Sequence, residues 1–267
     1  MSERRIRVDI DEAGVATVTL DRAEKHNALD RAMFDAIVDV AAQLADDRTV
    51  RAVVLHGEGK SFCSGLDITS LMQSDGGPSD LLAREEGALA NLAQRVSVDW
   101  SRVPAPVIAA ITGNCFGGGL QIALGADIRY ATPDAKLSVM EVKWGLVPDM
   151  GITQSLPRLV GIDVAKELTF TGRILSGTEA HSLGLVTRTV DDPLTAALEL
   201  AHEIAGKSPH AVRAAKRLYD ETWSGGDPAG ALLLESELQV SLMGSPNQLE
   251  AVTAGMTKRA ANFADPD

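Results

Sequence analysis

Apolar and polar residues alternate at the start of the chain, and this alternation predicts a β-hairpin. In the segments RIRVDI (5–10) and VATVTLD (15–21), polar and apolar residues alternate at nearly every position, and Gly14 lies in the turn between them. Longer apolar runs predict buried strands, because a strand that is covered on both faces has no polar side. The further predicted strands are RAVVLHG (51–57), PVIAAITG (106–113), DIRYA (127–131) and LGLVTRTV (183–190).

A period of three to four residues follows from Asp30 to about Asp47, which predicts an amphipathic helix with Asp30 as its N-cap. The same period predicts a longer helix over 81–103, and a run of glycines precedes a short predicted helix over 118–124. The remaining predicted helices are 162–170, 178–182, 193–206, 208–222, 229–242 and 246–262. Residues 72–80 (MQSDGGPSD) have the composition of a loop.

Strands alternate with helices through about residue 190, and the elements predicted after that are helices. Such alternation is typical of an α/β core. We therefore predict an α/β core over residues 1–200 and a helical C-terminal oligomerisation region over residues 201–267. Leu234, Leu238 and Met243 share one face of the tail, which suits either packing against the core or contact between subunits.

Composition and charge narrow the possible functions. The 267 residues are 45% hydrophobic and 23% charged, as in ordinary globular proteins, and the formal net charge of −12 argues against nucleic-acid or membrane binding. No apolar stretch is long enough to span a membrane, and the first residues lack the apolar segment of a signal peptide. Cys63 and Cys115 lack the spacing of a metal site. We expect a cytoplasmic protein without a bound metal.

Two segments share one design, in which a predicted strand is followed by a glycine-containing turn and then by a helix. They are HGEGKSFCSGLD (56–67) and GNCFGGGLQ (113–121). Active sites of α/β folds collect at such strand ends, and helix N-termini carry free N–H groups. Two such turns side by side can direct two N–H groups at one oxygen, which forms an oxyanion hole. The alternatives are close packing alone, a dinucleotide fingerprint and a phosphate loop. The glycine spacing argues against the fingerprint, and Leu120 after Gly119 argues against the phosphate loop.

The segment 137–159 supplies two carboxylates. Glu141 stands in a mostly apolar run, and Asp149 follows eight residues later. An acid among apolar neighbours can have a raised pKa and carry protons. Each side chain could instead be a surface group, and Asp149 could cap a helix that starts near Ile152.

Taken together, these segments resemble the crotonase family, also called the enoyl-CoA hydratase/isomerase family. The resemblance is carried by residues 21–30, 59–68, 106–131, 140–161 and 166–190, and it ends at 258–263. It implies a spiral of ββα units with a helical C-terminal region, usually assembled as a homotrimer or a dimer of trimers. It also implies an enzyme that binds acyl-CoA thioesters and stabilises an enolate, with coenzyme A as part of the substrate and no separate cofactor.

The same resemblance assigns roles to residues. It places the two oxyanion-hole N–H groups on Leu66 and Gly118. It implies substrate contacts for Ala23, Lys25, Ser64, Gly65, Asp67, Ile68, Gly117, Gln121, Pro148 and Lys258. Lys258 matches a basic position that approaches the CoA phosphates from a neighbouring subunit, although a helical lysine can also face solvent.

Gln121 separates the subgroups of this family. Hydratases typically carry two glutamates, which would fall on Gln121 and Glu141, and an amide neither accepts nor delivers a proton in ordinary catalysis. The spacing of Glu141 and Asp149 resembles that of dienoyl-CoA isomerases, in which the aspartate removes a distal proton and the glutamate delivers one near the carbonyl, although their third acid is again Gln121 here. We therefore predict an enoyl- or dienoyl-CoA double-bond isomerase of fatty-acid metabolism. The alternatives are a 2-enoyl-CoA hydratase, a non-catalytic acyl-CoA-binding relative and a nucleotide-binding oxidoreductase.

Overall fold

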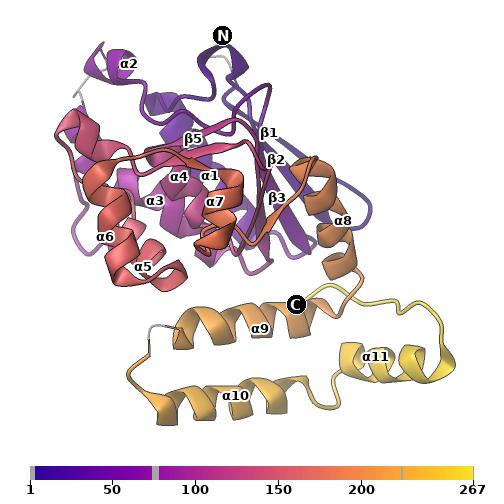
Figure 1. Cartoon of the computed structure of the whole chain (residues 1–267). Helices are drawn as coiled ribbons and strands as arrows, with labels where there is room; N and C mark the ends of the chain where they lie inside the picture. The colour runs from indigo at the N-terminus through magenta and orange to yellow at the C-terminus, as the bar shows by residue number, and fades with distance from the viewer. Residues whose placement is uncertain (1–3, 74–77, 224, 267) are drawn as a thin grey trace.

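The computed structural model describes residues 4–73, 78–223 and 225–266, and a six-stranded sheet forms its centre (Figure 1). The strands are β1 (Ile6–Ile10), β2 (Val15–Leu20), β3 (Ala52–Gly57), β4 (Val107–Ile111), β5 (Asn114–Phe116), β6 (Ile128–Ala131), β7 (Lys136–Ser138), β8 (Leu175–Ser176) and β9 (Arg188–Thr189). The large sheet has the order β1-β2-β3-β4-β6-β9, in which β1 is antiparallel to β2 and the later neighbours are parallel. A smaller sheet has the order β5-β7-β8.

Helices cover both faces of the large sheet and continue into a tail. They are α1 (Arg31–Asp46), α2 (Ile68–Gln73), α3 (Leu92–Val98), α4 (Gly118–Leu124), α5 (Leu156–Leu159), α6 (Ile162–Thr171), α7 (Gly177–Ser182), α8 (Pro193–Ala205), α9 (Pro209–Thr222), α10 (Pro228–Leu242) and α11 (Pro246–Thr257). Short 3-10 helices are η1 (Ala23–Lys25), η2 (Pro78–Leu82), η3 (Asp99–Arg102), η4 (Glu141–Trp144) and η5 (Ile152–Gln154).

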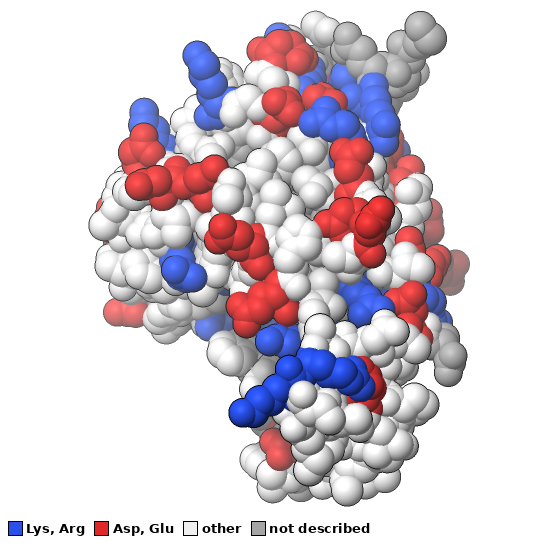
Figure 2. Space-filling view, turned by 90° about the vertical axis from the view of Figure 1, so that its right-hand side faces the viewer, with Lys and Arg blue, Asp and Glu red and all other residues white. Residues whose placement is uncertain are grey.

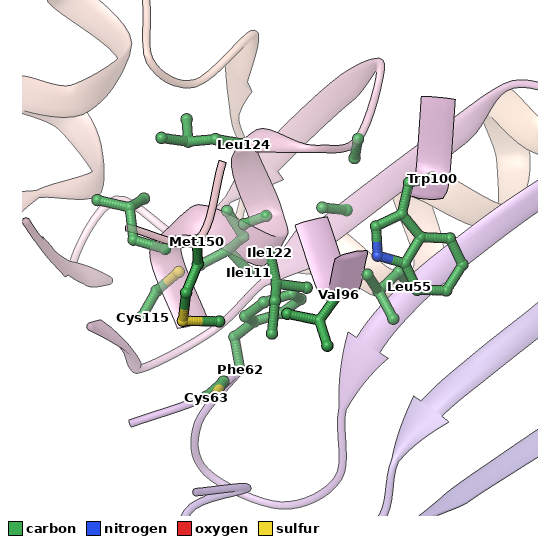
Figure 3. Close-up of a cluster of buried hydrophobic side chains, with 14 of the residues drawn as sticks. Leu55, Phe62, Cys63, Val96, Trp100, Ile111, Cys115, Ile122, Leu124 and Met150 are labelled. Carbon is green, nitrogen blue, oxygen red and sulfur yellow. The ribbon is translucent and has the colours of Figure 1, made fainter. Parts of the chain in front are cut away.

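The buried strands direct alternate residues into two hydrophobic clusters, one on each face of the sheet. On one face, Ala197, Ala201 and Ala205 of α8 pack on the strands, and their four-residue spacing keeps these small side chains on one side of the helix. The other face meets α1, α3 and α4, and this larger cluster includes Phe62 and Trp100 (Figure 3). The α/β core predicted from the sequence is therefore confirmed.

A repeated path through the two sheets positions the functional segments. The chain runs from β4 in the large sheet to β5 in the small one and then into α4, and it repeats this path from β6 through β7 into η4. This is the ββα spiral that the resemblance implies. Because β5 and β7 are parallel neighbours, residues that follow them in sequence lie side by side. The Gly117 N–H, for example, donates to the Ser138 carbonyl at 2.9 Å.

Two predictions for the middle of the chain differ from the structure. The continuous helix predicted over 81–103 is wrong, because α3 begins at Leu92, where Asn91 and Gln94 form a capping box. Upstream, Gly87 has a φ of 79°, which a right-handed helix cannot include. The loop predicted over 72–80 is wrong for its described residues, because 72–73 belong to α2 and 78–80 belong to η2, while 74–77 lie outside the described residues.

The later corrections concern short strands and helix ends. The strand predicted over 183–190 is reduced to β9, because the chain turns at Gly184, whose φ is 90°. The last helix ends at Thr257 instead of residue 262, since Lys258 adopts a left-handed conformation with a φ of 53°. The strands β5, β7 and β8 are absent from the prediction because each has two or three residues, too few for a periodic pattern.

The helices α9 to α11 form a tail that extends below the sheet in Figure 1. The buried Lys216 attaches α9 to the body, because its Nζ donates to the Trp100 and Ala105 carbonyls at 3.2 Å and to Asp127 at 2.8 Å. None of the residues of α10 is buried. A separate oligomerisation region over 201–267 stays a prediction. Within residues 4–73, 78–223 and 225–266, none of the helices has both the length and the apolar character of a membrane span.

Candidate active site

The two glycine-containing turns lie side by side. The backbones of Cys63 and Cys115 pair as an isolated parallel β-bridge. The Cys63 N–H donates to the Asn114 carbonyl and the Phe116 N–H donates to the Cys63 carbonyl, both at 3.0 Å. A Cβ added to Gly65 would lie 3.8 Å from the Gly118 nitrogen. The end of the first turn therefore reaches the start of α4, as the sequence led us to expect.

Two backbone amides at this junction lack a hydrogen-bond partner among the described residues. Gly118 begins α4, so its N–H has no partner within the helix, and the Leu66 N–H likewise donates to no acceptor among the described residues. Leu66 is held on both sides, because the Gly65 carbonyl accepts from the Leu29 N–H at 2.8 Å and the Asp67 N–H donates to the Leu29 carbonyl at 3.0 Å. Backbone that is held by hydrogen bonds in this way suits a preorganised donor.

The glycine triplet has three separate structural roles. Gly117 has a φ of 52°, and a Cβ there would lie 3.3 Å from Glu141 Oε1. A Cβ on Gly118 would lie 2.6 Å from Met150 Sδ, and one on Gly119 would lie 2.5 Å from the Cys63 carbonyl oxygen. The triplet thus allows the turn, the donor position and the close approach of the two turns.

Glu141 lies directly beside this junction, at the start of η4. Its side chain is nearly buried, with 8% of its surface exposed. Oε1 accepts a hydrogen bond of 2.6 Å from Gln121 Nε2, and Oε2 is buried without a hydrogen-bond partner among the described residues. Burial raises the pKa of the Glu141 carboxyl, and the charge of Asp149 raises it further. A carboxyl with these properties suits proton transfer.

Gln121 is almost fully enclosed, with 1% of its surface exposed. Its Oε1 accepts from the Met150 N–H at 2.9 Å, while its Nε2 faces Glu141. The same amide therefore connects helix α4 to both ends of the 141–150 segment. The sequence predicted a substrate contact for Gln121, and the structure adds these two protein contacts.

Asp149 lies at the open side of the same segment. Its side chain is exposed by surface area, yet the surrounding protein desolvates the carboxyl enough to raise its pKa. The alternative that Asp149 caps the following helix is wrong, because Gly151 is the N-cap of η5 and that cap has no side-chain hydrogen bond. Pro148, also predicted as a site residue, is half-buried next to it.

The segments that were expected to border the substrate also meet. The Ser64 N–H donates to the His26 carbonyl at 3.0 Å, and the Ser64 hydroxyl donates to the Lys25 carbonyl at 3.4 Å. Ala23 and Lys25 in η1 are exposed, as is Ile68 at the start of α2. These residues form one accessible edge next to the turn that carries the Leu66 amide.

Arg22 is a residue of this region that the sequence analysis missed. Its buried guanidinium contacts Asp67 Oδ2 at 2.9 Å and donates to the Ala28 carbonyl at 2.9 Å. Asp67, which was expected to contact substrate, is therefore bound to Arg22, and it also accepts from the Ser70 N–H at 3.1 Å. The available signal was a pair of opposite charges on two segments that were expected to meet.

Lys258 is not brought to the site within one chain, because it lies exposed at the end of α11 in the tail. A hollow of about 330 Å³ lies between α9 and α10, and one of about 430 Å³ lies beside the β1–β2 turn and the C-terminal residues. None of the predicted site residues lines either hollow.

The two cysteines, Cys63 and Cys115, do not form a second reactive site. Burial raises the pKa of Cys63 to about 12 and that of Cys115 well above its ordinary value, so both thiols stay protonated and unreactive. They line the hydrophobic cluster behind the turns together with Phe62, Met150 and Ile122 (Figure 3). Among the described residues, no group of three His, Cys, Asp or Glu side chains is placed to hold a metal ion.

Comparison with known proteins decides the family. A model of the enoyl-CoA hydratase/isomerase family matches residues 11–266 of the chain. The chain belongs to this family. The resemblance read from the sequence motifs is thereby confirmed, and with it the assignment to a family of acyl-CoA enzymes.

The relatives carry different activities in their names. The chain is 36% identical over 264 residues to a mitochondrial Delta(3,5)-Delta(2,4)-dienoyl-CoA isomerase of Mus musculus, covering 95% of this chain and 80% of that one. It is 30% identical over 269 residues to a mitochondrial methylglutaconyl-CoA hydratase of Mus musculus, covering 98% of this chain and 83% of that one. The crystal structure of an enoyl-CoA hydratase from Mycobacterium smegmatis matches with a TM-score of 0.86 and 33% identity, over 97% of this chain and 99% of that one. The crotonase-like fold is therefore confirmed, and the choice of reaction depends on the chemistry of the site.

Proposed function

We propose that this enoyl-CoA hydratase/isomerase family member is a double-bond isomerase of enoyl- or dienoyl-CoA. The observation that carries the proposal is the pairing around Glu141. Its hydrogen-bonded neighbour is the neutral Gln121, and the second carboxyl that acts on it is Asp149, farther along the same segment. Two carboxyls that do not act on the same water molecule suit proton transfer between two carbons better than they suit activation of water.

In this mechanism the thioester oxygen accepts hydrogen bonds from the Leu66 and Gly118 amides. For a 3,5-dienoyl-CoA, Glu141 removes the C2 proton and the electron pair of the C2–H bond moves to the thioester oxygen, which gives an enolate conjugated with both double bonds. The pair then returns through the conjugated chain to C6, which takes a proton from Asp149 as the thioester carbonyl re-forms. The product is the 2,4-dienoyl-CoA. In the opposite direction Asp149 removes the distal proton and Glu141 delivers one at C2. The raised pKa of both carboxyls favours this exchange of acid and base roles.

The remaining parts of the proposal concern binding. Coenzyme A is part of the substrate, and the mechanism uses no metal and no separate cofactor. The edge formed by Ala23, Lys25, Ser64 and Ile68 supports contact with the CoA moiety, because these residues are exposed or partly exposed next to the proposed oxyanion amides. We further propose a homotrimer or a dimer of trimers, in which Lys258 approaches the CoA phosphates of a neighbouring subunit.

The test compares two substrates and one substitution. Wild-type protein is supplied with 3,5-dienoyl-CoA and, separately, with 2-enoyl-CoA. Isomerisation is followed by the gain of absorbance of the conjugated 2,4-dienoyl product, and hydration by the loss of absorbance of the conjugated 2-enoyl thioester. We expect isomerisation to exceed hydration, and Asp149→Asn to reduce isomerisation by about 100-fold or more, the usual contribution of a general acid or base. Asp134→Asn, at an exposed aspartate outside the site, is the control. Fast hydration without isomerisation, unchanged in Asp149→Asn, would sink the proposal.

A 2-enoyl-CoA hydratase is the second candidate, and a relative whose name carries that class of activity supports it. In that case Glu141 works with a water held by Gln121, and Asp149 is dispensable. A non-catalytic acyl-CoA binder is the third, motivated by the neutral Gln121. Measurable turnover that Glu141→Gln abolishes, while acyl-CoA still binds, would exclude the binder.

A further inference from the structure

Both ends of the Gln121 amide are committed to the protein. Nε2 donates to Glu141 Oε1 at 2.6 Å, and Oε1 accepts from the Met150 N–H at 2.9 Å. Because a backbone N–H can only donate, the Met150 contact determines which end of the amide faces Glu141. Glu141 Oε1 is therefore occupied, and Oε2 is the oxygen that lacks a partner among the described residues.

The same bridge connects the proton-transfer segment to the oxyanion turn. The Met150 backbone binds Gln121, and the Met150 side chain lies against Gly118, where an added Cβ would be 2.6 Å from Sδ. Gln121 is itself held in α4, because its N–H donates to the Gly117 carbonyl at 3.0 Å and its carbonyl accepts from the Ser97 hydroxyl at 2.7 Å. Glu141, Met150 and the Gly118 amide are therefore positioned by one connected set of contacts.

We propose that Gln121 is a positioning residue that holds Glu141 so that Oε2, and not Oε1, exchanges the proton with C2 of the acyl thioester. The proposal rests on the proposed function for its substrate class, an acyl-CoA. In the step, the C2–H bond breaks, the proton moves to Glu141 Oε2, and the electron pair moves to the thioester oxygen at the Leu66 and Gly118 amides. The reverse step returns a proton from the same oxygen to C2. Gln121 itself neither gains nor loses a proton.

Charged groups on Glu141's own element and on the elements that pack against it do not compete with Gln121 for the Glu141 carboxyl. They are Asp149 from the following loop, Lys143 from η4, Asp163, Lys166 and Glu167 from α6, and Arg173 from the turn after α6. Asp149 is the one whose charge acts on the Glu141 carboxyl, and Glu167 and Arg173 pair with each other at 2.7 Å. Burial and Asp149 raise the pKa of Glu141, while the hydrogen bond from Gln121 lowers it. Removing the Gln121 amide therefore raises this pKa.

The test is hydrogen exchange at C2 of a saturated acyl-CoA in D₂O, followed by NMR as a function of pD. This reaction uses Glu141 and the oxyanion amides and does not depend on Asp149. Gln121→Met removes both hydrogen bonds at similar side-chain size. We expect kcat for exchange to fall about 10- to 100-fold, as for the loss of a hydrogen bond to a charged group, with KM changed by less than about threefold. The acid limb of kcat/KM should move to higher pD.

A second variant and a control complete the experiment. Gln121→Glu keeps an acceptor for the Met150 N–H but adds a carboxyl beside Glu141, so its acid limb should also move to higher pD. Gln43→Met, at an exposed glutamine of α1, should match the wild type. The proposal would be overturned if both Gln121 variants had the kcat and the acid limb of the pD profile of the wild type, or if only KM increased. A wild type that does not exchange C2 hydrogens would overturn it as well.

The outcome is separable from that of the proposed function. A wild type that exchanges C2 hydrogens but does not isomerise dienoyl-CoA contradicts the isomerase proposal. The pD profiles of the two Gln121 variants then still decide whether Gln121 positions Glu141, because the exchange reaction involves no double bond. Should Gln121→Met fail to fold, Gln121→Glu provides the same comparison.

Discussion

At the scale of single residues, the site combines a buried acid with a neutral partner. Gln121 supplies one hydrogen bond to Glu141 but no charge, and Glu141 Oε2 is buried without a partner among the described residues. A carboxylate in such a place destabilises the folded state, because lost hydration is only partly replaced. Such groups are typical of functional sites, where activity is retained at the expense of stability.

Glu141→Gln is therefore expected to stabilise the protein while it abolishes proton transfer at C2. The folded-state pKa of Glu141 is raised above the ordinary value of 4.5, so the wild type loses free energy of unfolding as pH rises from that value through the folded pKa. Glu141→Gln has no carboxyl at this position and therefore does not show this loss of free energy of unfolding. Its Tm should equal that of the wild type near about pH 4 and exceed it by a few degrees near about pH 8. Calorimetry across this range measures the difference.

The control for this prediction is Glu199→Gln, at an exposed glutamate of α8, whose Tm is compared with that of the wild type at the same pH values. A pH-independent difference in Tm between Glu141→Gln and the wild type would contradict a buried acid with a raised pKa. Retained C2 exchange in Glu141→Gln would contradict its catalytic assignment.

Residue type and spacing were enough to single out Glu141 and Asp149, because an acid in an apolar run is unusual in itself. The contacts of Gln121 were not predictable in this way. They arise because β5 pairs with β7, which brings residues 20 positions apart together, and no local pattern records that pairing. The ion pair of Arg22 with Asp67 was missed for the same reason, since it joins segments on either side of α1.

At the scale of elements, the site depends on two turns that pack closer than most side chains allow. The run of glycines and the strand-like segments before each turn made this arrangement predictable. Long apolar runs and a strong N-cap such as Asp30 likewise predicted β3, β4 and α1. The second sheet was not predictable, because its strands are shorter than the period of any pattern and depend on tertiary pairing.

Gly119→Ala tests the approach of the two turns. The added Cβ would lie 2.5 Å from the Cys63 carbonyl oxygen, so the turns must separate and the two amides proposed to bind the thioester oxygen lose alignment. We expect a loss of about 1–3 kcal/mol in the free energy of unfolding, as for an overpacked core. We also expect a fall of about 100-fold in kcat for C2 exchange, as for loss of an oxyanion donor. Urea denaturation and the exchange assay measure these effects.

The matched control is Gly255→Ala in α11, where an added Cβ meets no atom within 4 Å. That change should stabilise the protein by about 0.5–1 kcal/mol, because alanine favours a helix more than glycine does, and it should leave exchange unchanged. Equal stability and activity in Gly119→Ala and the wild type would show that the turns need no close contact.

At the scale of the whole molecule, charge and apolar surface are distributed unevenly. Acidic and basic side chains cover the body, whereas the tail has few on the face in Figure 2. Helix α10 exposes large apolar side chains, including Leu233 at 59% and Val240 at 71%. The sequence left open whether this tail packs on the core or on another subunit. Since α10 buries none of its residues within one chain, contact between subunits is the arrangement that would cover this surface.

Leu233 and Val240 stand seven residues apart and so lie on one side of α10, which makes them a direct test of the expected trimer. Light scattering should give a mass near three or six times 28.2 kDa for the wild type and a smaller mass for Leu233→Glu/Val240→Glu, because two buried charges destabilise an apolar interface. Ile10→Glu, at an exposed position of β1, should keep the wild-type mass. A monomeric wild type would refute the trimer, and an unchanged mass in the double variant would show that the interface does not include α10.

If Lys258 of a neighbouring subunit also binds the CoA phosphates, the dissociated variant should show an increased KM for acyl-CoA, since the phosphates then lose a cation that one chain does not bring to the site.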